Sequence, residues 1–105
     1  MTYVAKYSET APARAEIDAL PGPLLLEFGI DSCPHCQAAQ AFIEAALRDH
    51  PELRHIKIKD GPGRRLGRSF RVKLWPTLIL MHGGQEAGRI VRPGSEREIS
   101  ELLAA

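Results

Sequence analysis

A chain of 105 residues, of which 44% are hydrophobic and 26% charged, has the composition of one globular domain spanning residues 1–105. The net charge of +1 points to no particular class of partner. The longest apolar stretch, Leu74–Met81, is interrupted by Pro76 and Thr77 and is too short to cross a bilayer, so we expect no membrane association. The N-terminus has no basic segment followed by an apolar one, which predicts a cytoplasmic protein.

Strand and helix patterns alternate along the chain. The first half predicts an alternating strand at 3–7, a short helix capped by Ser8 or Thr10, a buried strand at 24–28 and a helix from Pro34 to about Asp49. The second half predicts a strand at 53–59, a short basic helix at 64–70, a strand at 72–81, a hairpin turn at 82–85, a strand at 86–91 and a last helix opened by the capping box Ser95–Glu98. The order β-α-β-α-β-α-β-β-α predicts an α/β fold with a central mixed β-sheet flanked by helices.

Basic residues are concentrated in segment 48–73, which holds nine Lys and Arg against three acidic residues and carries +6, whereas residues 1–47 carry −4. Two interpretations stay open: a solvated basic face, and a surface that attracts acidic partners. Aromatic residues do not alternate with these charges, so nucleic-acid binding is not expected.

The two cysteines, Cys33 and Cys36, stand three positions apart at the start of the predicted second helix. A disulfide across so short a loop adds little stability, so the pair is predicted to be reactive rather than structural. Cys33 is expected at the N-cap, where free N–H groups and the helix dipole stabilise a thiolate, and Pro34 suits the first helical position. Cys36 is expected to face the interior within reach of Cys33. This arrangement suits thiol–disulfide exchange, in which one thiolate attacks and a second thiol resolves the mixed disulfide.

His35 lies between the two cysteines. A protonated ring beside Cys33 would lower the pKa of the Cys33 thiol and stabilise the reduced pair, which makes the pair more oxidising. The alternative is an exposed side chain with no effect on the sulfur.

These motifs together resemble the thioredoxin family over essentially the whole chain. The resemblance rests on the run EFGIDSCPHC at 27–36, on Trp75-Pro76-Thr77 followed by a strand, on the Gly83-Gly84 hairpin and on the terminal helix. It implies a thioredoxin-like fold in which Pro76 is cis and packs beside Cys33.

The resemblance also implies roles for individual residues. The family pairs the backbone before the cis-proline with the substrate, so Trp75, Pro76, Thr77 and Arg92 are expected along a substrate groove. For Trp75 the alternative is a core tryptophan. Glu27 resembles the buried acid that accepts a proton when Cys36 resolves the intermediate.

Glu27 is also notable from the residues alone. A lone acid in an apolar strand would have a raised pKa, which suits a proton acceptor. The alternative is a glutamate exposed at the sheet edge or paired with Lys57 or Lys59.

Several positions depart from the family pattern. Ser32 and Gly29 stand where the family usually has tryptophan, Pro34-His35 stands where Gly-Pro is common, and Arg92 stands where a glycine is usual. Pro-His between the cysteines is similar to the periplasmic thiol oxidases, but the chain has no room for their helical insertion before Pro76. The substrate and the redox direction therefore stay open.

Zinc binding is a competing interpretation, because Cys33, Cys36, His50 and His55 fit a loose two-Cys, two-His spacing. Pro51 separates the two histidines, however, and a finger places both on one helix. We therefore expect no metal, with His50, His55 and His82 at the surface.

The sequence thus predicts a monomeric thiol–disulfide oxidoreductase that acts on disulfide-containing proteins, most simply as a reductase. Its electrons are expected from a thioredoxin-reductase-like enzyme or a small thiol, with no bound cofactor. The alternatives are a binding module without significant redox turnover, and a more oxidising thiol oxidase or isomerase.

Overall fold

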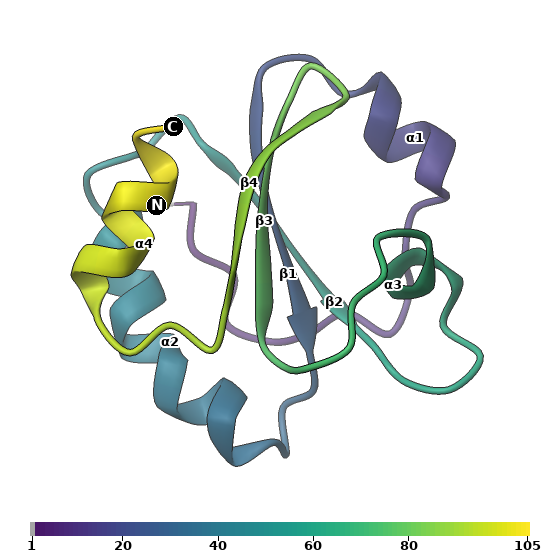
Figure 1. The fold of residues 1–105 in the computed structure, drawn as a ribbon, viewed down its shortest axis with the longest axis horizontal. Coiled ribbons are helices and arrows are strands. Elements are labelled where there is room, and N and C mark those ends of the chain that lie inside the picture. Colours follow the sequence, from purple (N-terminus) through teal and green to yellow (C-terminus); the bar gives the residue numbers. More distant parts are fainter. Residues whose placement is uncertain (1) are drawn as a thin grey trace.

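The computed structural model describes residues 2–105, which contain four helices and four strands. In chain order these are α1 (Arg14–Ala19), β1 (Pro23–Gly29), α2 (Pro34–Leu47), β2 (Arg54–Lys59), α3 (Arg65–Ser69), β3 (Thr77–His82), β4 (Gln85–Val91) and α4 (Glu96–Leu103). The strands form one sheet in the order β2-β1-β3-β4 (Figure 1). β1 is parallel to β2 and antiparallel to β3, which pairs antiparallel with β4. The expected mixed sheet with a hairpin at one edge is confirmed.

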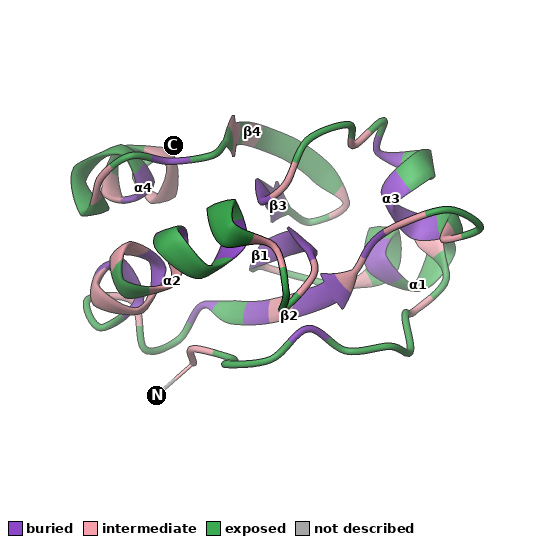
Figure 2. Ribbon diagram, turned by 90° about the horizontal axis from the view of Figure 1, so that it is seen from below, coloured by how far each residue is buried: buried purple, intermediate pink, exposed green. Residues whose placement is uncertain are grey.

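Helices cover both faces of this sheet. α1 and α3 lie on one face, and α2 and α4 lie on the other (Figures 1 and 2). Leu24, Leu26 and Phe28 of β1 belong to the core under α1 and α3, whereas Leu25 belongs to the core under α2 and α4. Both faces of β1 are therefore apolar, which explains its continuous hydrophobic run. Because side chains alternate along a strand, Glu27 shares the α2 face with Leu25. Within the described residues, no helix has the length and apolar character needed to cross a membrane.

α2 begins directly at the cysteine motif. Cys33 is its N-cap, with φ −78° and ψ 123°, and Pro34 is its first residue, where a missing N–H costs nothing. Cys36, Ala39 and Ile43 are buried at spacings of three and four residues, so this face of the helix packs on the sheet. The second cysteine is thereby turned into the protein while the first stays at the helix end.

Residues 3–7 do not form the expected strand. The Val4 N–H donates to Nδ1 of His55 at 2.9 Å, so a side chain rather than a neighbouring strand satisfies this backbone group. Only Ser8 pairs with the sheet, through an isolated parallel bridge to Ile58. The order of elements is therefore α-β-α-β-α-β-β-α, with one strand fewer than predicted.

α1 begins later than either predicted cap. Ser8 is held at the sheet and its hydroxyl bonds Thr10, so neither residue starts the helix. Ala13 is the N-cap, and its N–H donates to the Glu16 carboxylate at 3.2 Å. The cap is thus provided from within the helix by an acidic side chain in its first turn.

The strand predicted at 72–81 begins only at Thr77. The Trp75–Pro76 peptide bond is cis, as the resemblance implies, and the residues before it turn rather than extend. α3 closes with Arg71 at φ 59°, a left-handed conformation that usually holds glycine at this position and costs other residues about 1–2 kcal/mol.

The predicted hairpin turn and last helix are both present. Gly83 and Gly84 have φ 57° and 83°, the positive values that a tight hairpin turn requires. Ser95 caps α4 by accepting the Glu98 N–H at 3.2 Å. The Glu98 carboxylate accepts from the Gly94 N–H and from the Ser95 hydroxyl rather than from the Ser95 N–H, so only half of the predicted capping box forms.

The hairpin glycines predict unequal effects of substitution. A Cβ on Gly84 would collide with the Asp18 carbonyl oxygen, whereas nothing lies within 4 Å of a Cβ on Gly83. Both alanine variants carry the left-handed conformational cost of about 1–2 kcal/mol, and Gly84→Ala adds the collision. We expect its free energy of unfolding, measured in urea, to fall by about 1 kcal/mol or more below that of Gly83→Ala. Equal losses would contradict close packing of the hairpin on α1.

Candidate active site

Cys33 and Cys36 sit at the end of the sheet where α2 begins. Cys33 is partly exposed, whereas Cys36 is 1% exposed, and both are free thiols. The structure thus presents one sulfur to solvent and keeps the second inside, as the motif predicts for an attacking and a resolving thiol.

The environment of Cys33 favours its thiolate. Burial raises the pKa of this thiol, but the backbone N–H and the thiol of Cys36 and the backbone N–H of His35 lower it, with help from the Arg92 charge. The net pKa is lowered. The N–H groups are those left free at a helix N-terminus. His35 acts here through its backbone, and its side chain is exposed.

The environment of Cys36 favours the protonated thiol. Burial raises its pKa to about 11. A thiol with this pKa is protonated near neutral pH, so it must lose a proton before it can attack a disulfide. The two sulfurs are therefore prepared for different steps.

Behind the cysteines, a hydrogen-bond network surrounds the fully buried Glu27 of β1. Its Oε2 accepts from the Tyr7 hydroxyl at 2.5 Å and from Nε2 of Gln40 at 2.9 Å, and its Oε1 lies 2.9 Å from Nε2 of His55. Because Nδ1 of His55 accepts the Val4 N–H, the ring proton lies on Nε2 and is donated to the carboxylate. Three side chains therefore donate to one carboxylate.

This network corrects two expectations. Glu27 is not a lone acid: burial raises its pKa, but the hydrogen bond from His55 and the Lys57 charge, together with Gln40, bring the net pKa below its usual value. His55 is not at the surface but is 5% exposed, because the carboxylate of β1 lies beside it. Of the other two histidines expected at the surface, His50 is half-buried and His82 is exposed.

Neither lysine proposed as a partner of Glu27 forms an ion pair with it. Lys57 donates from Nζ to the Ala5 carbonyl at 2.6 Å and to Oε1 of Gln40 at 2.7 Å, and Lys59 pairs with Glu9 at 3.1 Å. Lys57 is nonetheless buried on the same face of β2 as His55, so its charge acts on the carboxylate through space.

Sequence reasoning missed three residues of this network: Tyr7, Gln40 and His55. Tyr7 was assigned to a strand that does not form, and Gln40 was one polar residue on a long helix. Gly29 was the one available signal for this network. It stands where the family usually has tryptophan, so another large side chain has to fill the space that the missing tryptophan leaves.

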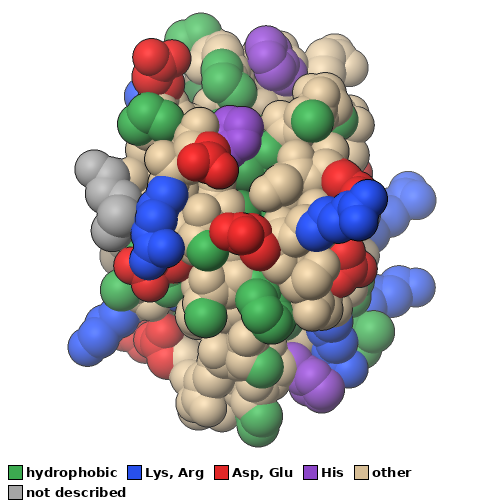
Figure 3. Space-filling model, turned by 90° about the vertical axis from the view of Figure 1, so that its left-hand side faces the viewer, with side chains coloured by type: hydrophobic (Ala, Val, Ile, Leu, Met, Phe, Trp, Pro, Cys, Tyr) green, Lys and Arg blue, Asp and Glu red, His purple; other side chains and the backbone are tan. Residues whose placement is uncertain are grey.

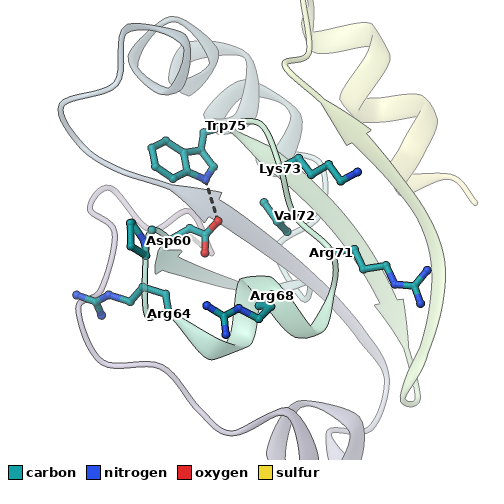
Figure 4. Close-up of a pocket in the computed structure, with 9 residues that line it drawn as sticks. Asp60, Arg64, Arg68, Arg71, Val72, Lys73 and Trp75 are labelled. Atoms are coloured by element: carbon teal, nitrogen blue, oxygen red, sulfur yellow. Dashed lines mark hydrogen bonds between the residues drawn. The ribbon is translucent and has the colours of Figure 1, made fainter.

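The loop before β3 carries the remaining predicted residues. Trp75 is half-buried rather than a core residue, and its Nε1 donates to Asp60 at 2.9 Å (Figure 4). Arg92, at φ 52°, donates from Nε to the Trp75 carbonyl at 2.8 Å and from its N–H to the Pro76 carbonyl at 2.9 Å. Thr77 is buried at the start of β3. Arg92 therefore links the cis-proline loop to the charge environment of Cys33.

The histidine positions do not fit the zinc interpretation. Nδ1 of His55 is occupied by a backbone N–H and Nε2 by Glu27, so neither nitrogen is free to bind a metal. Across the described residues 2–105, no group of three or more His, Cys, Asp or Glu side chains is arranged to hold a metal ion.

Comparison with known proteins agrees with this geometry. Residues 6–105 match the thioredoxin family. Thioredoxin 2 of Pseudomonas aeruginosa PAO1, solved in its reduced form, is 55% identical with a TM-score of 0.85, and the match covers 94% of this chain and 92% of that one. Trxlp of Edwardsiella tarda EIB202 is 26% identical with a TM-score of 0.73, over 85% and 88% of the two chains. A thioredoxin of Peptoclostridium acidaminophilum is 26% identical over 93 residues, 88% of this chain and 84% of the relative.

The fold and the cysteine pair define a thioredoxin-like protein-disulfide oxidoreductase. The chain belongs to the thioredoxin family, as residues 6–105 show.

The charge of Arg92 yields a prediction for Cys33. We expect Arg92→Gly to raise the pKa of the Cys33 thiol, since the lost charge stabilises the thiolate. Arg92→Lys is the matched control that keeps the charge but cannot reproduce the guanidinium hydrogen bond to Trp75. The pH dependence of Cys33 alkylation by iodoacetamide, followed by mass, measures both variants. An unchanged pKa in Arg92→Gly would show that Arg92 acts only on the loop.

Glu27 yields a pH prediction. Its pKa is lowered in the folded protein, so its ionisation adds stability above the unfolded pKa of about 4.3 and this stability is lost as pH falls through the folded pKa. We expect the difference in unfolding free energy between wild type and Glu27→Gln to shrink as pH decreases from neutral to acid. Urea unfolding at a series of pH values measures it. A difference independent of pH would contradict an ionised Glu27.

Proposed function

We propose that the chain reduces disulfides in protein substrates, with Cys33 as the attacking thiolate and Cys36 as the resolving thiol. The asymmetry of the two sulfurs carries this proposal. Cys33 is accessible at a helix N-terminus with a lowered pKa, and Cys36 is buried with its pKa raised to about 11. When one sulfur attacks the substrate and the other resolves the mixed disulfide, the two thiols need this difference in pKa and in exposure.

The chemistry follows two exchange steps. The Cys33 thiolate attacks one sulfur of the substrate disulfide and expels the other as a thiolate, which takes a proton from solvent. Cys36 then loses its proton and attacks the Cys33 sulfur, and the second substrate thiolate leaves. Two electrons pass from the dithiol to the substrate, and a Cys33–Cys36 disulfide remains. We assign Glu27 as the acceptor of the Cys36 proton because it is a buried carboxylate behind the cysteines. Its lowered pKa keeps it ionised at neutral pH but makes it a weaker base than the lone acid expected from the sequence.

The substrate groove is assigned to Trp75, Pro76, Thr77 and Arg92, with Pro34 and His35 tuning the pair. The hydrogen bonds of Arg92 to the Trp75 and Pro76 carbonyls support this grouping around the cis-proline. A substrate chain that pairs with the Trp75 carbonyl would have to displace the Arg92 side chain. Arg92 would then favour substrates whose own contacts replace the hydrogen bond that Arg92 loses.

We place this reaction in the reducing cytoplasm and in a monomer, with a thioredoxin-reductase-like enzyme or a small thiol returning the electrons. The redox chemistry resides in the two sulfurs, so the proposal includes no bound cofactor. A more oxidising thiol oxidase or isomerase is the second candidate, because the backbone N–H of His35 lowers the pKa of the Cys33 thiol and so favours the reduced pair.

A redox titration tests the direction. Equilibration with glutathione or dithiothreitol couples, followed by Trp75 fluorescence and by thiol counting, gives the potential of the Cys33–Cys36 pair. A value near the thioredoxin potential of about −270 mV supports a reductase. A value shifted towards −120 mV, roughly the potential of a strong oxidase, supports the second candidate. If no intramolecular disulfide forms at any ratio of oxidised to reduced couple, both redox functions are overturned and a binding module remains.

Removing the resolving thiol gives a direct prediction. We expect Cys36→Ser to accumulate a covalent complex with a disulfide substrate, because the mixed disulfide on Cys33 is no longer resolved. Mass spectrometry detects the adduct, and dithiothreitol releases it. Cys33→Ser is the matched control and is expected to form no adduct, because Cys36 is buried. Equal labelling of the two variants would contradict the assigned roles.

A further inference from the structure

The space beside the resolving cysteine is created by a glycine. A Cβ built on Gly29 would lie 2.5 Å from Sγ of Cys36 and 2.7 Å from the Tyr7 hydroxyl oxygen. The thiol and the hydroxyl therefore lie beside the same bare backbone of Gly29, and any larger residue there would displace one of them. The Tyr7 hydroxyl also lowers the pKa of the Cys36 thiol, against the larger effect of burial.

The same Tyr7 hydroxyl donates to Oε2 of Glu27 at 2.5 Å. Tyr7 is 6% exposed, although its chain segment has no regular secondary structure. Its hydroxyl thus donates to the carboxylate that can accept a proton and lies beside Gly29 together with the thiol that must lose one. A hydroxyl is both donor and acceptor, which suits it to pass a proton between two groups.

The other side chains of the network form hydrogen bonds with atoms other than the Cys36 sulfur. Gln40 donates to the Cys36 carbonyl, not to its sulfur, as well as to Glu27. Lys57 is held by Ala5 and Gln40, and His55 binds the opposite carboxylate oxygen. The titratable groups around the thiol and the hydroxyl are Glu27 from β1, His55 and Lys57 from β2, Cys33 from α2 and Asp31 from the preceding loop.

We propose that the Tyr7 hydroxyl relays the proton from Cys36 to Glu27 while Cys36 resolves the mixed disulfide. The proton of the Cys36 thiol passes to the Tyr7 oxygen as the Tyr7 proton passes to Glu27, so the tyrosine is unchanged at the end. The electron pair left on Cys36 forms the new bond to Cys33, and the bond between Cys33 and the substrate breaks, releasing the substrate thiolate. The inference rests on the proposed function and adds the route by which the resolving thiol is activated.

A two-step chromogenic reaction tests this relay. The reduced protein is mixed with the chromogenic disulfide dithiobis(nitrobenzoate). Attack by Cys33 releases one equivalent of coloured thiolate, and resolution by Cys36 releases a second. We expect Tyr7→Phe to leave the first phase unchanged and to slow the second roughly 10- to 100-fold near neutral pH. The deficit should shrink as pH approaches 11, because the Cys36 thiol then ionises without help.

Tyr3→Phe is the matched control. The Tyr3 hydroxyl donates to Gln40 at 2.6 Å, so this variant also removes one hydroxyl from the network but none beside Cys36. Wild-type rates in both phases are expected. Gly29→Ala should slow the second phase as Tyr7→Phe does, with folding of each variant checked by urea unfolding. A pH-independent loss in Tyr7→Phe would indicate a structural role and overturn the relay.

The outcomes separate the relay from the proposed function. If the wild type releases both equivalents and Tyr7→Phe matches its second phase at every pH, the relay is wrong while dithiol exchange stands. If the wild type releases no second equivalent, the proposed function itself fails.

A different observation concerns the basic segment, which the exchange chemistry leaves without a role. A pocket of about 460 Å³ lies between α3 and Trp75, and Arg64, Arg68, Arg71 and Lys73 are among its lining residues (Figure 4). Within residues 2–105, none of these four cations has a carboxylate within ion-pair distance. Acidic and basic side chains are instead interspersed on the α2–α4 side (Figure 3).

The charged ends of Arg71 and Lys73 point away from Trp75 and Asp60, so these positive charges lie around the pocket rather than inside it (Figure 4). The sequence has no Asp or Glu between Asp60 and Glu86, and Asp60, the acidic residue among those that line the pocket, accepts a hydrogen bond from the Trp75 indole. Arg71 stands in a left-handed conformation that favours glycine, so a positive side chain is present where backbone geometry disfavours it.

We infer that this pocket binds an acidic segment next to the disulfide of a protein substrate. Trp75 lines the pocket and also precedes the cis-proline, so one bound chain can contact both. Unpaired cations at the entrance of a site attract anionic chains and raise their association rate. This inference also rests on the proposed function, because it assigns a substrate class to the same reaction.

Two synthetic disulfide peptides, identical except for Glu or Gln beside the disulfide, test the assignment. We expect the Glu peptide to be reduced with a higher kcat/KM, and this preference to fall with added salt. Arg68→Ser combined with Arg71→Gly should lower the preference several-fold with unchanged kcat/KM for the Gln peptide. Arg48→Ser combined with Arg54→Ser is the control, since it removes two exposed positive charges outside the pocket.

Equal preferences in the two double variants would overturn the acidic-substrate inference. If the wild type reduces neither peptide, the proposed function itself is wrong. Arg71→Gly alone provides a second check, because relief of the left-handed conformation should raise the melting temperature while the preference for the Glu peptide falls.

Discussion

A carboxylate buried in the middle of a sheet must find hydrogen-bond donors, or its desolvation destabilises the fold by several kcal/mol. Glu27 is in this position, and its donors come from three separate parts of the chain: Tyr7 before α1, Gln40 in α2 and His55 in β2. One side chain thus connects the central strand to a helix, to a neighbouring strand and to a segment without regular structure. The arrangement around the cysteines depends on these bonds.

The positive charge of Lys57 completes this environment. Its Nζ lies 4.4 Å from the centre of the Tyr7 ring and donates to the Ala5 carbonyl, so it holds the irregular segment against β2. Desolvation lowers the pKa of Lys57, while the carboxylate of Glu27 opposes that change. The buried acid and the buried base therefore support one another's charged forms without direct contact.

Most of the fold follows from local patterns. β1 is recognisable as an apolar run, α2 from its small residues and from Pro34, and the hairpin from Gly83-Gly84, because each pattern reflects the backbone of its own segment. The position of the cysteine pair follows in the same way from the start of α2. Residues 3–7 alternate like a strand, yet their backbone is bound by side chains distant in sequence, which no local pattern reveals.

The site is harder to predict from the sequence than the fold, for a related reason. The acid at Glu27 is indicated both by the resemblance and by its place in an apolar strand. Its pKa depends on His55 and Lys57, whose inward direction is fixed only when β2 pairs with β1. The start of β3 was placed too early because the cis peptide at Pro76 turns the chain. Arg92 stands out in sequence as a departure, whereas its bond to the Trp75 carbonyl belongs to the folded loop.

The irregular segment before α1 has a consequence for how relatives are compared. A comparison that considers helices and strands alone would leave out this segment, because it has no regular secondary structure. In this protein that segment supplies a hydroxyl that donates to Glu27 and lies, with the Cys36 thiol, beside Gly29. Relatives should therefore be grouped by the pair Tyr7 and Gly29, a bulky residue before the first helix matched to a small one at the end of the first strand.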